Sequence, residues 1–216
     1  MIKVEQIEVF NFEGAIRGMR NPMNSWDKSD SIKCYENADC PFICNNNRCG
    51  WCIGENDLDL MRRLYKAGTE HRKYLRQIVV SMDIIAPLYW WKEFDTYKVG
   101  TTTNSCSTMH KIAAKEFTLE DFSTDHLNNP ALNVFNSVIE CLNNYREHYL
   151  ACKCKIDWWQ MIQLLPSSYN QKRTVTMNYE NVVSIIKQRS GHKLDEWNTL
   201  VDIFKGLPYI HSIMEV

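Results

Sequence analysis

The sequence predicts an α+β fold in which helices outnumber strands. Two segments, at residues 2–10 and 77–85, have the composition of strands, whereas most other segments have helical periodicity. The strands are not regularly interleaved with helices, so a doubly wound sheet is not expected. The chain has 216 residues, 44% of them hydrophobic, which suffices for a sizeable core. We predict one domain over residues 1–216 with a helix-rich C-terminal half, although two small domains also fit this length.

The charge pattern excludes several partners. The formal net charge is −1, so no global field draws the chain to nucleic acid or to an anionic membrane. The N-terminus, Met1 to Glu5, carries charge too early for a signal peptide, and no run is long enough to span a bilayer. We therefore expect a cytoplasmic, reducing location, where the nine cysteines would not build a disulfide framework.

The N-terminal part predicts a strand, a short helix and an insert. Residues 2–10 roughly alternate between apolar and polar side chains, which predicts a strand. Residues 13–20 predict a short helix that ends before Asn21-Pro22. Residues 21–56 are rich in Asn, Asp, Cys and Gly and lack periodicity. They predict an irregular region with a cysteine-rich insert at about 30–55.

Two helices are expected after the insert. Asn56-Asp57 offer a cap for a helix over 58–67, and Gly68 closes it. A second, basic helical stretch is expected at 70–76.

The middle of the chain predicts a strand, a helix and a polar loop. Residues 77–85 have the β-branched content of a largely buried strand. Pro87 suits the first turn of a helix that runs to about residue 98. Residues 101–108 are all small and polar, so they cannot pack a core and expose hydroxyls and amides, as a binding loop does.

The C-terminal half predicts helices throughout. Residues 118–148 contain two helical stretches separated by Asn128-Asn129-Pro130. Further helices are expected over 156–164, 178–189 and 192–205.

Two segments carry the functional signal. The first contains Ala86-Pro87, Thr96-Tyr97-Lys98 and Asn104-Ser105-Cys106-Ser107. The second contains Leu165-Pro166, Tyr169, Thr176-Met177-Asn178, Arg189 and Glu196-Trp197. In this order and spacing the two segments resemble the flavin-dependent thymidylate synthases, the ThyX family. In that family an Ala-Pro helix leads to Arg-His-Arg and then to a serine. A Leu-Pro, Tyr, Thr-x-Asn, Asn-Leu-Arg and Gln-Trp-Glu pattern follows.

The first segment departs from the family pattern in its charges. The Arg-His-Arg position is Thr96-Tyr97-Lys98, and Ser107 follows after eight intervening residues, which fits the family spacing. A family glutamine corresponds to Glu93, and a family arginine corresponds to Met109. Some phage-type members have Thr-His-Arg in the triplet, which brings this chain closer to them.

The second segment is also consistent with a site on physical grounds. Asn178 and Arg189 are eleven residues apart, which places them on one face of a helix about 16 Å apart. That separation suits one contact to an isoalloxazine ring and one to a nucleotide phosphate. The alternatives are that Asn178 is a helix cap and that Arg189 interacts with the helix dipole.

The resemblance implies a set of site residues. Ser107 and Arg189 are the candidates for catalysis. Cofactor binding falls on Thr96, Tyr97, Lys98 and Asn178. Substrate binding falls on Glu93, Ser105, Cys106, Ser107 and Arg189.

The resemblance also implies a fold and an activity. The fold is a central antiparallel or mixed sheet flanked by helices. The activity is reductive methylation of dUMP to dTMP with FAD, with methylenetetrahydrofolate as carbon donor and NADPH as reductant. A homotetramer is implied, with sites built from several subunits. Because arginines are lost, the alternative is a catalytically silent homologue that binds a nucleotide or acts in assembly.

The cysteines pose separate questions. The insert supplies enough thiolates for a tetrahedral zinc site, for which we assign Cys40, Cys44, Cys49 and Cys52, with Cys34 as the spare. The alternative is that these cysteines are incidental. We interpret Cys106 as a small loop residue, with a nucleophilic role as the minority alternative.

Overall fold

The computed structural model describes residues 2–34 and 50–214, and over these residues it is an α+β protein with an antiparallel sheet. The four-stranded sheet has the order β1-β4-β6-β5. Its strands are β1 (Lys3–Phe10), β4 (Val79–Pro87), β6 (Asn170–Asn178) and β5 (Thr101–Ser105). The predicted fold class is therefore confirmed, and antiparallel is the correct choice between the two sheet types.

Strands β5 and β6 correct the sequence prediction. Residues 101–108 were expected to form a loop, but residues Thr101–Ser105 form the edge strand β5, four of whose side chains are exposed. Residues Asn170–Asn178 were not predicted as a strand, yet β6 lies between two other strands and buries Val175 and Met177. The backbone N–H and C=O groups of both strands form hydrogen bonds with segments that are distant in the sequence. Local composition does not predict such pairing.

The chain divides into two compact units, which are described separately below. Unit 1 comprises Met1–Lys3, Ile84–Thr96 and Asn104–Thr174. Unit 2 comprises Val4–Asp83, Tyr97–Thr103 and Val175–Val216. The single domain over residues 1–216 stays a prediction.

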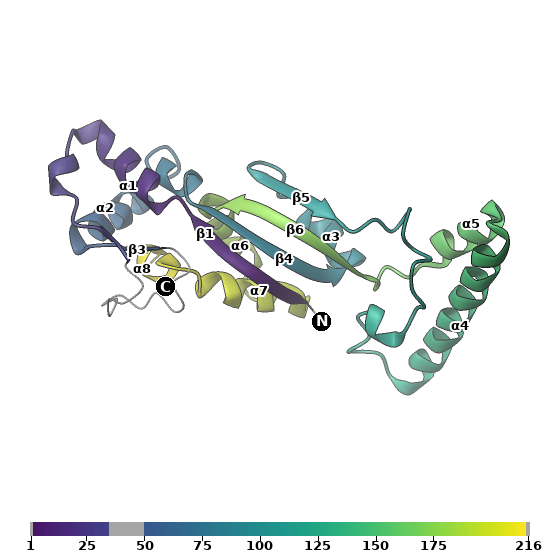
Figure 1. Cartoon of the computed structure of the whole chain (residues 1–216). Coiled ribbons are helices and arrows are strands. Elements are labelled where there is room, and N and C mark those ends of the chain that lie inside the picture. The colour runs from purple at the N-terminus through teal and green to yellow at the C-terminus, as the bar shows by residue number, and fades with distance from the viewer. Residues whose placement is uncertain (1, 35–49, 215–216) are drawn as a thin grey trace. The chain divides into compact units, whose positions relative to one another are not determined.

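Unit 1 contains α3 (Leu88–Phe94), the 3-10 helix η4 (Leu119–Asp121), α4 (Asn129–Cys152) and α5 (Lys155–Leu164). Helices α4 and α5 pack against each other as a hairpin (Figure 1). The Asn128 side chain caps α4 by accepting a hydrogen bond from Ala131 N at 3.1 Å. Only one 3-10 turn precedes α4 where a longer helix was predicted.

Aromatic and aliphatic side chains form the core of unit 1. Helix α3 buries Trp90, Trp91 and Phe94 completely, or nearly so. A second cluster contains Ile112, Phe117, Phe122, Ile139, Leu142 and Met161. Helix α3 ends at Phe94 and not near residue 98 as predicted, so Thr96 follows the helix.

Unit 2 holds most of the remaining helices. They are α1 (Phe12–Arg20), α2 (Glu55–Lys66), α6 (Tyr179–Arg189), α7 (Asp195–Lys205) and α8 (Ile210–Met214). The short elements are η1 (Asn21–Met23), η2 (Trp26–Lys28), η3 (Lys73–Arg76) and a two-stranded sheet of β2 (Ile32–Lys33) and β3 (Trp51–Cys52). The basic helix predicted over 70–76 is reduced to the 3-10 turn η3.

A buried ion pair joins α1 to α2. Arg20 Nε lies 2.6 Å from Asp57 Oδ1, and the two side chains are 4% and 0% exposed. The hydroxyls of Ser29 and Ser31 each donate to Asp57 Oδ2 at 2.7 Å. Asp57 was predicted to cap α2. Instead, α2 begins at Glu55 with Gly54 at the N-cap, and Asp57 lies within the helix, where it holds Arg20.

Candidate functional site

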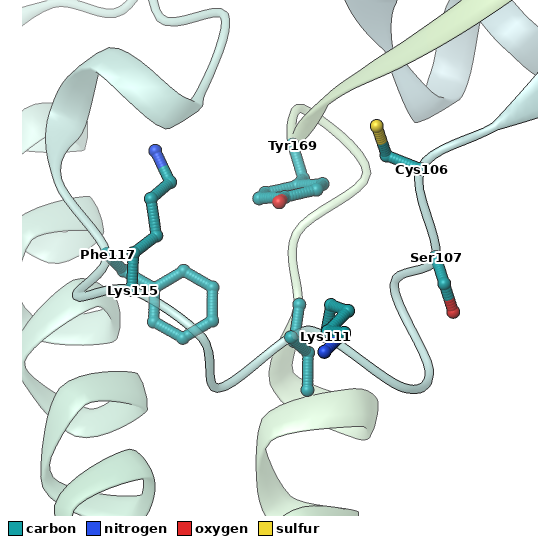
Figure 2. A pocket seen from close by; sticks show the side chains of 7 residues that line it. Cys106, Ser107, Lys111, Lys115, Phe117 and Tyr169 are labelled. Atoms are coloured by element: carbon teal, nitrogen blue, oxygen red, sulfur yellow. The ribbon is translucent and has the colours of Figure 1, made fainter.

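A cavity in unit 1 lies beside the polar segment that follows β5 (Figure 2). Its volume is about 310 Å³. It is lined by Cys106, Ser107, Lys111, Ile112, Lys115, Phe117 and Tyr169. In Figure 2 the Tyr169 ring lies between the Cys106–Ser107 segment and the Lys115–Phe117 segment. We call these seven residues the Lys111 pocket.

Hydrogen bonds fix the segment that carries Cys106 and Ser107. Cys106 N donates to Lys172 O at 2.9 Å, and Gln171 Nε2 donates to Cys106 O at 2.8 Å. The Ser107 hydroxyl accepts a hydrogen bond from His110 N at 3.0 Å, which closes a turn. The Ser107 hydroxyl oxygen therefore has a partner within its own turn, and the hydroxyl can also donate a hydrogen bond.

The electrostatics of the pocket favour an anion. Lys115 is paired with Asp121, whose hydrogen bond raises the pKa of the lysine. Lys111 is exposed and forms no ion pair with any residue that the structure describes. Burial raises the pKa of the Tyr169 phenol, with the charge of Asp121 adding to the rise, so the phenol stays a neutral donor. The pocket thus offers an ammonium group and a hydroxyl to an acceptor-rich ligand.

A second group of predicted residues meets in unit 2. Arg189 Nε donates to the Tyr97 hydroxyl at 2.9 Å, and that hydroxyl donates to Gln188 Oε1 at 2.9 Å. The Arg189 guanidinium carbon lies 4.5 Å from the centre of the buried Trp197 ring. His192 Nε2 lies 3.1 Å from Arg189 Nη1. We call Tyr97, Arg189, His192 and Trp197 the Arg189 cluster.

The hydrogen bond to Tyr97 and the contact with the Trp197 ring fix the orientation of the Arg189 guanidinium. A planar guanidinium has five donors, so a fixed one can recognise a carbonyl or phosphate oxygen in a defined direction. Tyr97, predicted to bind the cofactor, and Arg189, predicted to bind the substrate, therefore lie in contact. The sequence did not point to His192.

Asn178 caps α6, as the alternative interpretation expected. Its Oδ1 accepts from Asn181 N at 3.1 Å. Gly100 has φ +70°, and a Cβ added there would lie 2.5 Å from Asn178 Nδ2. Asn181 Nδ2 also donates to Val99 O at 2.8 Å. The turn after Lys98 is thus fixed against the start of α6, and the Asn178 side chain serves this packing.

The other predicted residues of unit 1 lie outside the pocket lining. Glu93 is in the last turn of α3, and its carbonyl accepts from the Thr96 hydroxyl at 2.7 Å. Ser105 is exposed at the end of β5. Arg173, a further cation of unit 1, is paired with Asp95 at 2.7 Å, and its guanidinium carbon lies 4.2 Å from the centre of the Trp91 ring. Its charge is therefore already neutralised.

Sequence reasoning missed Lys115 and Phe117 as pocket residues. They lie in an irregular segment between β5 and α4, where neither periodicity nor a motif marks a site.

Of the predicted zinc ligands, Cys40, Cys44 and Cys49 lie outside the described residues. Cys52 is buried in β3, and its Sγ lies 2.9 Å from Cys34 Sγ. A metal ion bound by Cys52 would therefore have the Cys34 sulfur within reach. This contact favours Cys34 as a ligand over its predicted role as the spare cysteine.

No family model and no curated protein matches the sequence. Solved structures share its fold. The flavin-dependent thymidylate synthase ThyX of Helicobacter pylori, complexed with FAD and dUMP, matches with a TM-score of 0.67 and 17% identity, over 98% of this chain and 97% of that chain. The UMP/dUMP methylase PolB of Streptomyces cacaoi, bound with 5-Br UMP, matches with a TM-score of 0.63 and 12% identity, over 100% of this chain and 92% of that chain. The fold of this chain is therefore ThyX-like.

None of the helices in the described residues combines the length and hydropathy that a membrane span requires.

Proposed function

We propose that the protein is a flavin-dependent thymidylate synthase, which methylates dUMP to dTMP with methylenetetrahydrofolate and NADPH. The observation that carries the proposal is the fixed guanidinium of Arg189, held by Tyr97 and Trp197, on a ThyX-like fold. Structural neighbours with this fold are a thymidylate synthase with FAD and dUMP and a UMP/dUMP methylase. The substrate class is accordingly a pyrimidine 5′-monophosphate.

The Lys111 pocket supplies the phosphate contact in this proposal. A phosphate monoester carries almost two negative charges and accepts charge-assisted hydrogen bonds. Lys111 supplies the charge, and the Ser107 and Tyr169 hydroxyls supply neutral donors. These groups take over from the family arginines that Thr96 and Met109 replace.

Arg189 supplies the directional contact to the uracil base. A uracil ring presents carbonyl oxygens, which a planar guanidinium recognises. The aromatic rings of Tyr97 and Trp197 pack against this donor, and the Tyr97 ring with the Lys98 ammonium forms a chemically suitable set for FAD as a bound group. When bound, FAD supplies the hydride and carries the one-carbon unit, while the protein binds and orients the reactants. Lys98 contributes a positive charge from the turn that Asn181 holds through its hydrogen bond to Val99 O.

The predicted homotetramer belongs to the same proposal. Helices α4 and α5 expose apolar side chains that a monomer would leave in water. These are Val134, Leu150, Ile156, Trp159 and Leu164, which are between 40% and 73% exposed. We infer that another subunit covers this surface.

We expect FAD to bind the assembled tetramer and not a monomer. Light scattering coupled to size exclusion, with and without FAD, measures the mass of the flavin-bound species. A stable monomer that binds FAD stoichiometrically would contradict this expectation.

Lys111→Ala should weaken dUMP binding roughly tenfold, because a charge-assisted contact to phosphate is lost. Binding of deoxyuridine, which lacks the phosphate, should not change. Calorimetry with both ligands measures the difference. Lys28→Ala, which removes one positive charge from the exposed end of η2, is the matched control. Equal loss of both ligands would show that Lys111 supports the loop and not the phosphate.

The second candidate function is a catalytically silent homologue that binds a nucleotide or acts in assembly. The pairing of Arg173 with Asp95 favours it, because this cation is not available to replace a lost arginine. The absorbance spectrum of the purified protein separates the two functions. Protein that carries flavin supports the synthase, whereas colourless protein that cannot be loaded with FAD supports the silent homologue. A cytoplasmic location and a zinc ion bound by the cysteine-rich insert belong to the same proposal.

A further inference from the structure

The turn between α4 and α5 in unit 1 gathers three metal-ligating side chains, none of which lines the Lys111 pocket. Helix α4 ends at Cys152, Cys154 is the N-cap of α5, and Asp157 lies in the first turn of α5. The two sulfur atoms and a carboxylate oxygen of Asp157 all lie within 4.8 Å of one another. Among the described residues, this is the group whose ligand atoms converge closely enough to hold a metal ion.

The backbone brings these side chains together in a short space. Lys153 has φ 56°, in the left-handed region that residues other than glycine rarely adopt, and Lys153 and Cys154 alone separate α4 from α5. Cys154 N then donates to Cys152 Sγ at 3.2 Å. Cys152 Sγ lies 3.5 Å from Asp157 Oδ2. Both cysteines are exposed, so solvent ions reach the sulfur atoms directly.

The structure joins Cys152 and Cys154 by a disulfide, although the sequence led us to expect reduced thiols. A dithiol reductant breaks the S–S bond by transferring two electrons and two protons, one thiol forming at each Sγ, and is itself oxidised to a disulfide. A metal ion then displaces the two thiol protons to solvent. Oxidised and reduced forms of this turn therefore differ in their capacity to bind metal.

We propose that the reduced turn is a binding site for a thiophilic divalent cation such as Zn²⁺ or Cd²⁺, with Cys152, Cys154 and Asp157 as ligands. Thiolates select such cations over Mg²⁺ and Ca²⁺, and a carboxylate is an accepted third ligand. Two thiolates and a carboxylate carry three negative charges, which leaves one in excess of a divalent ion. Lys153 and Lys155, which are adjacent to the ligands in sequence, add positive charge to this turn. Water completes the fourth tetrahedral position.

Cadmium titration of the full-length protein tests the proposal, with the cadmium–thiolate absorbance in the ultraviolet as the signal. The cysteines of the insert also bind Cd²⁺, so the quantity to measure is the difference in bound Cd²⁺ between the unaltered protein and a variant of the turn. Reduced protein should bind one Cd²⁺ more than the Cys152→Ser/Cys154→Ser variant. This difference should disappear when the turn is oxidised. Cys141→Ser removes a thiol from the middle of α4 and should bind as many ions as the unaltered protein.

Asp157→Asn distinguishes a three-ligand site from two reactive thiols. The asparagine keeps the size of the side chain but loses the negative charge, so cadmium affinity at this turn should fall more than about tenfold. Far-ultraviolet circular dichroism confirms that each variant is folded. Equal cadmium stoichiometry with and without Cys152 and Cys154 would overturn the proposal. Unchanged affinity in Asp157→Asn would also overturn it, as would equal uptake by the oxidised and reduced turns.

Discussion

Asp57→Asn is expected to lower the free energy of unfolding by about 3–5 kcal/mol, because it leaves the Arg20 guanidinium buried without a countercharge. Removing one partner of a buried pair costs far more than the pair itself contributes, since the remaining charge stays desolvated. The substitution also removes the second carboxylate oxygen, which accepts hydrogen bonds from both Ser29 and Ser31. Urea unfolding followed by circular dichroism gives the change.

A matched control lies one half-turn along the same helix. Asp59 pairs with Arg63 at 2.9 Å, but the two side chains are 62% and 65% exposed. Asp59→Asn should therefore change the free energy of unfolding by no more than about 0.5 kcal/mol. A loss below about 1 kcal/mol in Asp57→Asn would show that the Arg20–Asp57 pair does not hold α1 against α2.

The same carboxylate makes stability depend on pH in a defined direction. Burial raises the pKa of Asp57, but hydrogen bonds from Ser31, Ser29 and Arg20, with the charge of Arg20, outweigh it and lower the pKa below the ordinary 3.8. A depressed folded-state pKa contributes stability that is present above about pH 4 and is lost as pH falls toward the folded-state value. Asp57→Asn should remove this part of the acid sensitivity.

Arg189→Ala should weaken dUMP binding more than about tenfold, with a much smaller effect on FAD. The reason is the loss of a guanidinium whose orientation Tyr97 and Trp197 fix. Arg189→Lys should recover only part of the affinity, since an ammonium keeps the charge but not the planar donors. Calorimetry with each ligand separately measures both affinities.

Lys187→Ala is the control for this series. Lys187 lies near the same end of α6 and loses a positive charge, but its ammonium lies 4.8 Å from the Tyr65 ring centre and outside the Arg189 cluster. This variant should bind dUMP as the unaltered protein does. Equal losses of dUMP and FAD in Arg189→Ala would mean that Arg189 supports the fold and does not contact the nucleotide.

Local sequence signals predicted the elements that depend on local interactions. Helix α6 follows Asn178, whose side chain caps it, and its apolar positions Val182, Val183 and Ile186 are buried as the periodicity required. Helix α5 was likewise predicted within one residue of its observed bounds. In both cases the interactions that define the helix lie within a few residues of each other.

Elements that depend on distant partners were missed. Strand β6 begins with polar residues, and its burial comes from its neighbours in the sheet. Asp57 has the side chain of a helix cap, but its partner Arg20 is 37 residues away. No local sequence pattern predicts an ion pair between residues so far apart in the chain.

The residues of the candidate site also divide into those that the sequence predicted and those whose positions depend on tertiary contacts. The resemblance to the ThyX family singled out Tyr97, Arg189 and Ser107, and the structure joins the first two by a hydrogen bond. Lys115 and Phe117 reach the pocket through an irregular segment that packs against the α4–α5 hairpin. Their place depends on tertiary contacts, so the sequence did not predict it.

The most direct test of the proposed function is formation of dTMP by the purified protein. The protein is incubated with dUMP, methylenetetrahydrofolate and NADPH, with or without FAD, and the nucleotides are analysed by mass spectrometry. The account predicts a product in which a methyl group replaces one hydrogen of dUMP, formed only when FAD is present. Protein that binds FAD and dUMP but forms no methylated nucleotide would contradict it.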